Sequence, residues 1–115
     1  MFYTYAIRSE KDFKWYTGCT NDLRKRFKEH NDNKVHSTKG RGPFELIYCE
    51  ACLNKDDAFA REKYLKSGPG KHYLKNRLKR FLFLTGFKRE KTKRELEQEE
   101  IHRQVRAILE KSKAT

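Results

Sequence analysis

The chain has 115 residues and a formal net charge of +12, with 28 Lys and Arg against 16 Asp and Glu. A chain of this length builds one small core and excludes two independent cores of ordinary size. The charge favours a polyanion, above all nucleic acid, as the partner, because each neutralised phosphate releases condensed counterions. A membrane surface is a weaker alternative, as is a basic surface kept for solubility, for which a net charge of magnitude about 2–8 is enough.

The cysteines and the chain's apolar segments indicate where such a protein works. Three cysteines do not complete a disulfide framework, and no leading apolar segment is typical of a signal peptide or a membrane span. We therefore expect a reduced, cytoplasmic protein that makes no membrane contact. Cys49 and Cys52 form a C-x-x-C pair, but a structural zinc site needs a second pair. We interpret these thiols as packing residues.

The first thirty residues predict a β-hairpin followed by a helix. Residues 2–9 and 15–19 are rich in aromatic and β-branched side chains, and residues 10–14 between them are polar enough for a turn. Thr20 or Asn21 suits the N-cap of a helix that ends near Asn31, with Leu23 and Phe27 on its buried side.

The middle of the chain predicts one more strand and two more helices. Residues 32–43 form a basic, Gly-containing loop, and residues 44–50 form the third strand. A second helix starts at Asn54 and runs to Ser67, where Gly68-Pro69-Gly70 predicts a stop, and a shorter third helix spans residues 72–83. The expected fold class is α+β, a small three-stranded antiparallel sheet flanked by helices, over residues 1–83.

Residues 84–115 differ from this domain in composition. Alternating charges with apolar residues at Leu96, Ile101, Val105 and Ile108 predict an extra, amphipathic C-terminal helix. Residues 1–85 carry nineteen Lys or Arg against ten Asp or Glu, whereas residues 86–115 carry nine against six. The basic partner surface therefore belongs mainly to the first domain.

Two tyrosines share one face of the predicted hairpin. A five-residue turn pairs Ile7 with Tyr16, which makes Tyr5 and Tyr16 diagonal neighbours about 7–8 Å apart at the backbone. Both phenols then point into one site, although tyrosine is also an ordinary strand residue.

On the first helix, Arg26 and His30 flank the buried stripe, at about 300° and 340° when Leu23 is set to zero. Arg26 there either serves a site or lays its stem along the core edge. His30 either serves a site or interacts favourably with the C-terminal end of the helix dipole.

Glu62 is the unusual residue of the second helix. It lies within about 60° of Ala58 and Leu65, inside the apolar stripe. Burying an unpaired charge is costly, so a carboxylate there is paired with a cation, protonated or bound to a metal. A salt bridge to a neighbouring Lys or Arg is the simplest alternative to a functional role.

These motifs together resemble the GIY-YIG nuclease superfamily, in particular its small single-domain bacterial branch, which is similar to the N-terminal nuclease domain of the excision-repair incision subunit. The resemblance covers about residues 1–83. Four segments carry it: Tyr3-Thr4-Tyr5, Tyr16-Thr17-Gly18, Asn21-Asp22-Leu23 with Arg26, and Arg61-Glu62-Lys63. Tyr3-Thr4 stands in place of Gly-Ile, and Thr17 in place of Ile. Cys19 stands where the excision-repair enzymes carry a lysine, so no lysine role is transferred to this chain.

The resemblance implies that the protein is an endonuclease that hydrolyses DNA phosphodiester bonds with water and one divalent ion, Mg²⁺ or Mn²⁺, held by Glu62. Arg26 would stabilise the charge of the transition state. Tyr5 would be the general base and Tyr16 its partner, or the reverse; either phenol needs a neighbouring cation to lower its pKa. His30 would orient the phosphate or relay a proton, and Asn76 matches an asparagine that lines the site in some relatives.

DNA is the expected partner, with RNA possible, and the expected role is repair or processing with structural or weak sequence selectivity. Candidates for phosphate contacts, which position DNA without reading its sequence, are Arg24, Lys25, Lys28, Lys39 and Arg41. Three other functions remain open on the sequence: a non-catalytic nucleic-acid adaptor, an RNA-directed protein whose aromatic side chains stack on bases, and an interaction domain that dimerises through its C-terminal helix.

Overall fold

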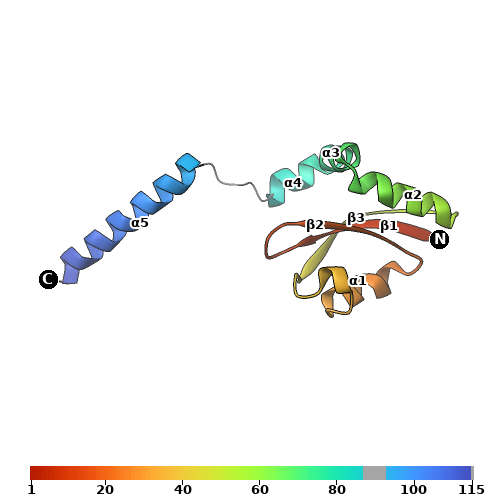
Figure 1. Cartoon of the computed structure of the whole chain (residues 1–115), viewed down its shortest axis with the longest axis horizontal. Coiled ribbons are helices and arrows are strands. Elements are labelled where there is room, and N and C mark those ends of the chain that lie inside the picture. Colours follow the sequence, from red (N-terminus) through yellow and green to blue (C-terminus); the bar gives the residue numbers. More distant parts are fainter. Residues whose placement is uncertain (87–92, 115) are drawn as a thin grey trace.

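The fold is built on one three-stranded antiparallel sheet with the strand order β2-β1-β3 (Figure 1). The strands are β1 (Phe2–Ser9), β2 (Trp15–Thr20) and β3 (Phe44–Cys52). The computed structural model describes residues 1–86 and 93–114. The α+β class with three antiparallel strands is confirmed.

The central strand β1 sets the register of the sheet. Ile7 lies opposite Tyr16 and Tyr5 lies opposite Gly18, so the predicted hairpin pairing is confirmed. Side chains alternate between the two faces of a strand. One face of β1 therefore carries Tyr5 and Ile7, and the other carries Thr4 and Ala6.

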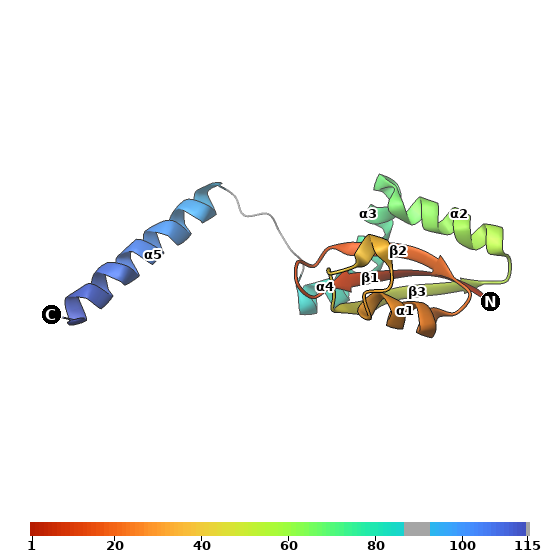
Figure 2. The ribbon, with the colours of Figure 1, turned by 60° about the horizontal axis from the view of Figure 1, so that its bottom comes forward.

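Helices cover both faces (Figures 1 and 2). Helix α1 (Leu23–Asn31) packs on the Tyr5 face, where a core of Tyr5, Ile7 and Phe44 receives Leu23 and Phe27. The opposite face is covered by α2 (Lys55–Lys66) and α3 (Gly68–Arg77), where Ala6 packs with Leu65 and Leu74.

The helix ends differ from the predicted ones at two places. The N-cap of α1 is Asp22, whose carboxylate accepts a hydrogen bond from the Lys25 amide, so Thr20 and Asn21 were wrong as caps. Helix α2 ends at Lys66, one residue from the predicted end, but Gly68-Pro69-Gly70 forms the first turn of the next helix instead of a gap before residue 72. The Ser67 hydroxyl accepts from the Gly70 amide and Pro69 sits in the first turn, where its missing N–H costs nothing, so α3 begins at once.

The predicted third helix, residues 72–83, is two helices. Helix α3 ends at Arg77, and α4 (Lys79–Thr85) follows after Leu78. The predicted loop 32–43 contains one short 3₁₀ turn, His36–Thr38.

A buried arginine ties α4 to the sheet. Arg8 on β1 is 3% exposed, forms an ion pair with Glu45 of β3 and donates from Nη1 to the Gly86 carbonyl at 2.9 Å. Its guanidinium lies 4.6 Å from the centre of the Phe13 ring and 5.0 Å from that of Phe81. The end of α4, the hairpin turn and β3 are thereby held together.

The C-terminal helix α5 spans Lys93–Ala114 and lies away from the sheet in Figure 1. Its apolar side chains Ile101, Val105 and Ile108 are exposed. The helical extension predicted over residues 84–115 is thus described as α5 from Lys93; residues 84 and 85 belong to α4, and residues 87–92 lie outside the described residues. Over residues 1–86 and 93–114, no helix combines the length and apolar character needed to span a membrane.

Candidate active site

The phenol of Tyr5 lies across Gly18 of the neighbouring strand. The residue is 2% exposed. A Cβ atom built on Gly18 would lie 2.4 Å from the Tyr5 hydroxyl and 2.6 Å from Cζ, closer than real Cβ atoms come to other atoms. Glycine at this position therefore provides the space in which the Tyr5 ring reaches the open edge of β2.

A chain of hydrogen bonds runs inward from this hydroxyl. The Tyr5 hydroxyl lies 2.7 Å from His30 Nε2, and His30 Nδ1 lies 2.7 Å from Thr38 Oγ1. His30 and Thr38 are 4% and 1% exposed. When His30 Nδ1–H donates a hydrogen bond to Thr38 Oγ1, the unprotonated Nε2 accepts a hydrogen bond from the Tyr5 hydroxyl. The sequence did not reveal Thr38, whose partner is eight residues away on α1.

Burial and one cation set the protonation states of this chain. Burial raises the pKa of Tyr5, and the nearby Arg26 guanidinium lowers it by a smaller amount. Burial also lowers the pKa of His30, and the positive charge of Arg26 lowers it further. At neutral pH the phenol keeps its proton and the imidazole is neutral, so the free lone pair of Nε2 accepts a hydrogen bond from the Tyr5 hydroxyl.

Arg26 of α1 and Glu62 of α2 act electrostatically on this hydroxyl from helices on opposite faces of the sheet, although neither lines the cavity that contains Tyr5. The Arg26 side chain is 40% exposed, and its Nη1 lies 3.9 Å from the Glu29 carboxylate. Glu62 belongs to α2, is 19% exposed, and accepts from Lys66 at 3.3 Å. The negative charge of Glu62 contributes to the raised pKa of Tyr5, as it does for Cys19 of β2. Charged groups from both α1 and α2 therefore influence the same hydroxyl.

The donor set at Glu62 fits a hard divalent cation held by few protein ligands. A single carboxylate suits Mg²⁺ or Mn²⁺, because Mg²⁺ keeps several waters and takes other ligands from substrate phosphate. Over the part of the chain that the structure describes, no three His, Cys, Asp or Glu side chains gather as a closed zinc site requires. Cys49 is exposed, so its interpretation as a packing residue was wrong.

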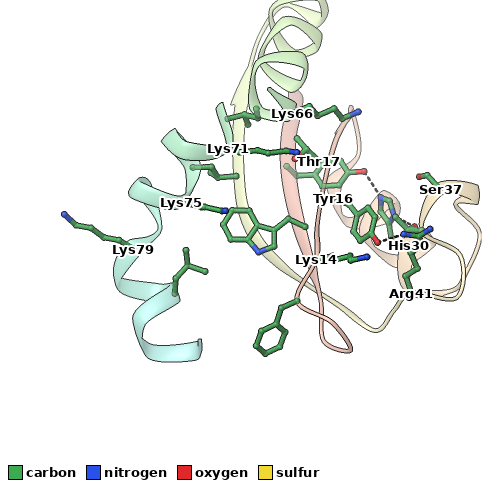
Figure 3. A pocket seen from close by; sticks show the side chains of 17 residues that line it. Lys14, Tyr16, Thr17, His30, Ser37, Arg41, Lys66, Lys71, Lys75 and Lys79 are labelled. Carbon is green, nitrogen blue, oxygen red and sulfur yellow. Dashed lines mark hydrogen bonds between the residues drawn. The ribbon is translucent and has the colours of Figure 1, made fainter. Parts of the chain in front are cut away.

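Tyr16 lies on the same face as Tyr5, with an arginine at its hydroxyl. Arg41 Nη1 donates to the Tyr16 hydroxyl at 2.9 Å, and this contact raises the pKa of Arg41. The Tyr16 ring packs edge-on against Phe44, with the ring centres 5.7 Å apart. Tyr16 and Arg41 thus place a hydroxyl and a fixed positive charge side by side in the cavity of Figure 3.

This cavity has a volume of about 800 Å³ and includes Tyr5, Tyr16 and His30 in its wall (Figure 3). Six cationic side chains also line it, and none of its described lining residues is Asp or Glu. The six are Lys14, Arg41, Lys66, Lys71, Lys75 and Lys79. The cavity therefore presents hydroxyl and imidazole groups within a strongly positive surround.

The other predicted site residues lie elsewhere. Asn76 is an exposed residue of α3 and is not part of the cavity wall. Lys28 is paired with Asp32 at 2.6 Å, and Lys39 is an exposed loop residue. Arg24 and Lys25 line two smaller cavities near the start of α1.

Among the five candidates for phosphate contact, only Arg41 lines the central cavity. The lysines that do line it were missed, although the four-residue spacing of Lys71, Lys75 and Lys79 is visible in the sequence.

The fold and this cluster define a small, basic α+β domain in which a tyrosine, a histidine, an arginine and a carboxylate meet at the edge of an antiparallel sheet. Residues 1–74 match the GIY-YIG catalytic domain. The chain therefore belongs to the GIY-YIG family of nuclease domains.

Three individual proteins are similar to parts of this chain. The UPF0213 protein CPE1444 of Clostridium perfringens is 46% identical over 57% of this chain and 71% of its own length. The UPF0213 protein YazA of Bacillus subtilis is 51% identical over 49% of this chain and 58% of its own length. The solution NMR structure of the UPF0213 protein BH0048 from Bacillus halodurans is 32% identical, covers 75% of this chain and 87% of that one, and gives a TM-score of 0.37.

The close approach of Tyr5 to Gly18 gives a testable consequence for stability. Gly18→Ala should lower the free energy of unfolding by about 1–3 kcal/mol, because the buried ring has to move away from the new methyl group. Gly68→Ala is the matched control: nothing lies within 4 Å of its added Cβ, and Ala in the first turn of α3 should be neutral or stabilising by up to about 1 kcal/mol. Urea denaturation measures both, and equal stabilities would contradict the packing argument.

The lowered pKa of His30 predicts how stability depends on pH. The unfolded chain takes up the imidazole proton first as pH falls, because its His30 pKa is the higher of the two. The contribution of neutral His30 to the free energy of unfolding is complete above about pH 6.5 and is lost progressively below it. The free energy of unfolding changes through this group by at most about 1.4 kcal/mol per pH unit. Between pH 7 and pH 5 the free energy of unfolding should fall less steeply in His30→Gln than in the wild type. Parallel curves would show that His30 is not the titrating group.

Proposed function

We propose that the protein is a metal-dependent DNA endonuclease that acts in DNA repair or processing. The observation that carries this proposal is the hydrogen-bonded Tyr5 and His30 pair, on whose phenol both Arg26 and Glu62 act electrostatically. Each group is of a type used in phosphodiester hydrolysis, and a binding module has no need of a hydrogen-bonded phenol and imidazole beside a partly buried carboxylate.

Tyr5 is the general base in this proposal, and His30 makes that role feasible. A buried phenol holds its proton at neutral pH, so it accepts a proton from water only if its own proton leaves. His30 Nε2 is 2.7 Å away and neutral, so it receives that proton as Tyr5 takes one from water. The Thr38 hydroxyl fixes the ring, which keeps Nε2 directed at the phenol.

Arg26, with Arg41 beside Tyr16, supplies fixed positive charge around the reacting phosphate. Charge gathers on the phosphoryl oxygens in the transition state, and preorganised donors there are worth about 2.7–4 kcal/mol each. Arg26 lies beside the base, whereas Arg41 is held by the Tyr16 hydroxyl. We assign Arg26 to the transition state and the Tyr16–Arg41 pair to binding of the phosphate.

Glu62 is the residue that would hold Mg²⁺ or Mn²⁺. Such an ion, when bound, polarises the phosphate and stabilises the leaving oxygen. Lys66 donates to the same carboxylate, so its ammonium group occupies Glu62 in the absence of an ion and keeps the partly buried charge paired.

The reaction consumes one water and breaks one phosphorus–oxygen bond. The water oxygen bonds to phosphorus, its proton passes to Tyr5, and the proton of Tyr5 passes to His30. The leaving oxygen takes a proton from solvent to become a hydroxyl, and the other new end keeps the phosphate. His30 then returns its proton to solvent.

The cations around the cavity indicate what the enzyme selects. Lysine and arginine contacts to phosphate position a nucleic acid without reading its bases. Selection by DNA structure, with weak sequence preference, follows from such a surface. The three free thiols Cys19, Cys49 and Cys52 suit a reducing compartment, and we place the protein in the cytoplasm.

Cleavage should require both the metal and Glu62. Labelled single-stranded, duplex, flapped and branched DNAs are incubated with Mg²⁺ or Mn²⁺, with and without EDTA. Glu62→Ala should abolish cleavage and leave DNA binding nearly intact, because the carboxylate is the one protein ligand assigned to the ion. Glu97→Gln, which alters an exposed carboxylate on α5, is the control. Metal-dependent cutting by Glu62→Ala would remove Glu62 from the site, and binding without any cutting by the wild type would favour an adaptor.

The two tyrosines should differ in how they affect turnover. Tyr5→Phe keeps the ring and removes the hydroxyl bonded to His30, so kcat should fall by about 10²–10⁴-fold, the usual contribution of a general base. Tyr16→Phe removes only the hydroxyl that holds Arg41, so its main effect should be on KM. Single-turnover cleavage of the preferred DNA separates these effects. The opposite pattern would make Tyr16 the base.

A further inference from the structure

The cavity continues past Tyr5 and His30 onto the other face of the sheet. Its floor there is apolar and includes Trp15, Leu74 and Leu82, and its wall carries Lys71 and Lys75 of α3. We call this part the lysine groove. Its cationic wall consists of Lys14, Lys71, Lys75 and Lys79, and its apolar floor consists of Phe13, Trp15, Leu74 and Leu82. In Figure 3, Lys71 and Lys75 extend toward β2, whereas Lys79 points away from it.

Three lysines of the groove, Lys71, Lys75 and Lys79, lie in a row along α3 and α4. Lys71 and Lys75 are four residues apart on one helical face, and Lys79 continues the spacing at the start of α4. Within residues 1–86 and 93–114 none of these three forms an ion pair, whereas Lys28 and Lys66 do. Neighbouring like charges repel each other, so a row of unpaired lysines is better stabilised by a bound polyanion.

The apolar floor narrows the kind of nucleic acid that fits. Trp15 is half-buried: part of its ring packs on the core of Ala6, Leu65 and Leu74, and the rest lines the groove. A duplex turns its bases inward and offers phosphate and sugar to a protein surface. An unpaired strand exposes the flat faces of its bases, which stack on aromatic side chains with about 1–3 kcal/mol per base.

The cavity at the opposite end of β2 has a different charge balance. It measures about 590 Å³ and is lined by Asp22 and Glu29 as well as by Lys25, Arg26 and Lys55. The two cavities share no lining residue. Asp22 and Glu29 weaken the attraction of this second cavity for phosphate. A DNA strand that passes Tyr5 and His30 is therefore held more firmly on the side of the lysine groove.

We propose that the lysine groove binds the unpaired DNA arm of a branched or flapped substrate, with phosphates on Lys71, Lys75 and Lys79 and a base against Trp15. This rests on the proposed nuclease function for the identity of the substrate, and it names the part of the substrate that the protein holds. The unpaired arm leads along the edge of β2 to Tyr5 and Glu62.

Trp15 provides a direct signal for the test, because it is the one tryptophan of the chain. Its fluorescence is titrated with oligo(dT) and with a blunt duplex of equal length, in EDTA, using the full-length Glu62→Ala protein so that no cutting occurs. Oligo(dT) should quench the fluorescence at lower concentration than the duplex does. Equal quenching at equal concentration would overturn the preference for an unpaired strand.

Two triple variants test the lysines with the same change in charge. Lys71→Ala/Lys75→Ala/Lys79→Ala alters the groove. The matched control is Lys63→Ala/Arg77→Ala/Arg80→Ala, which removes three exposed cations that lie outside the groove on α2, α3 and α4. All six side chains are exposed, so both variants should fold, and circular dichroism and thermal melting check this.

The groove variant should bind oligo(dT) about tenfold more weakly than the wild type. The magnitude of its slope of log K against log salt concentration should be smaller by about 2, because three phosphate contacts to a single strand each contribute about 0.7. The control variant should keep most of the affinity. Equal losses in both variants would show a general effect of net charge and would overturn the inference. Failure of the wild type to cut DNA would remove the proposed function but would not alter this binding result, so the two proposals fail separately.

Discussion

The candidate site depends on the seating of Tyr5 across Gly18. A tyrosine at the centre of a sheet normally fills the core, and here its ring does so while its hydroxyl reaches the neighbouring strand. The missing Cβ at Gly18 makes that reach possible, and His30 fixes its end through a hydrogen bond of 2.7 Å. The contact between the Tyr5 ring and Gly18 therefore determines both how the ring packs in the core and where its hydroxyl lies. The buried ring stabilises the fold, and the same burial keeps the hydroxyl protonated and His30 neutral.

The second constraint is that β2 lies at the edge of the sheet. In the order β2-β1-β3, one side of β2 carries no strand among the described residues. Helices α1 and α2 cover opposite faces, so their side chains meet only around such an edge. Arg26 from α1 and Glu62 from α2 both act electrostatically on the Tyr5 hydroxyl. A central strand would separate the two faces, because paired neighbours on both sides leave no passage between them.

Patterns with a fixed period were readable in the sequence, and contacts between distant segments were not. Alternation and turn length predicted the strands and the pairing of Ile7 with Tyr16, which the structure confirms. The start of α3 was missed because Gly and Pro suit both a helix end and a first turn, and the Ser67 cap decides between them. Thr38 meets His30, and Arg8 meets Gly86, through tertiary packing that leaves no local signal.

The distribution of ion pairs shows why net charge alone was an insufficient guide to the binding surface. Sequence reasoning placed three of the five candidate phosphate contacts, Arg24, Lys25 and Lys28, on α1, but Lys28 there is paired with Asp32. A cation that already has a carboxylate partner gives up that contact when it binds phosphate. Among the described residues, Lys71, Lys75 and Lys79 have no ion-pair partner to give up, and they line the cavity that contains Tyr5. In the proposed complex, Trp15 adds stacking to charge and places the unpaired arm at the same edge of the sheet as Tyr5.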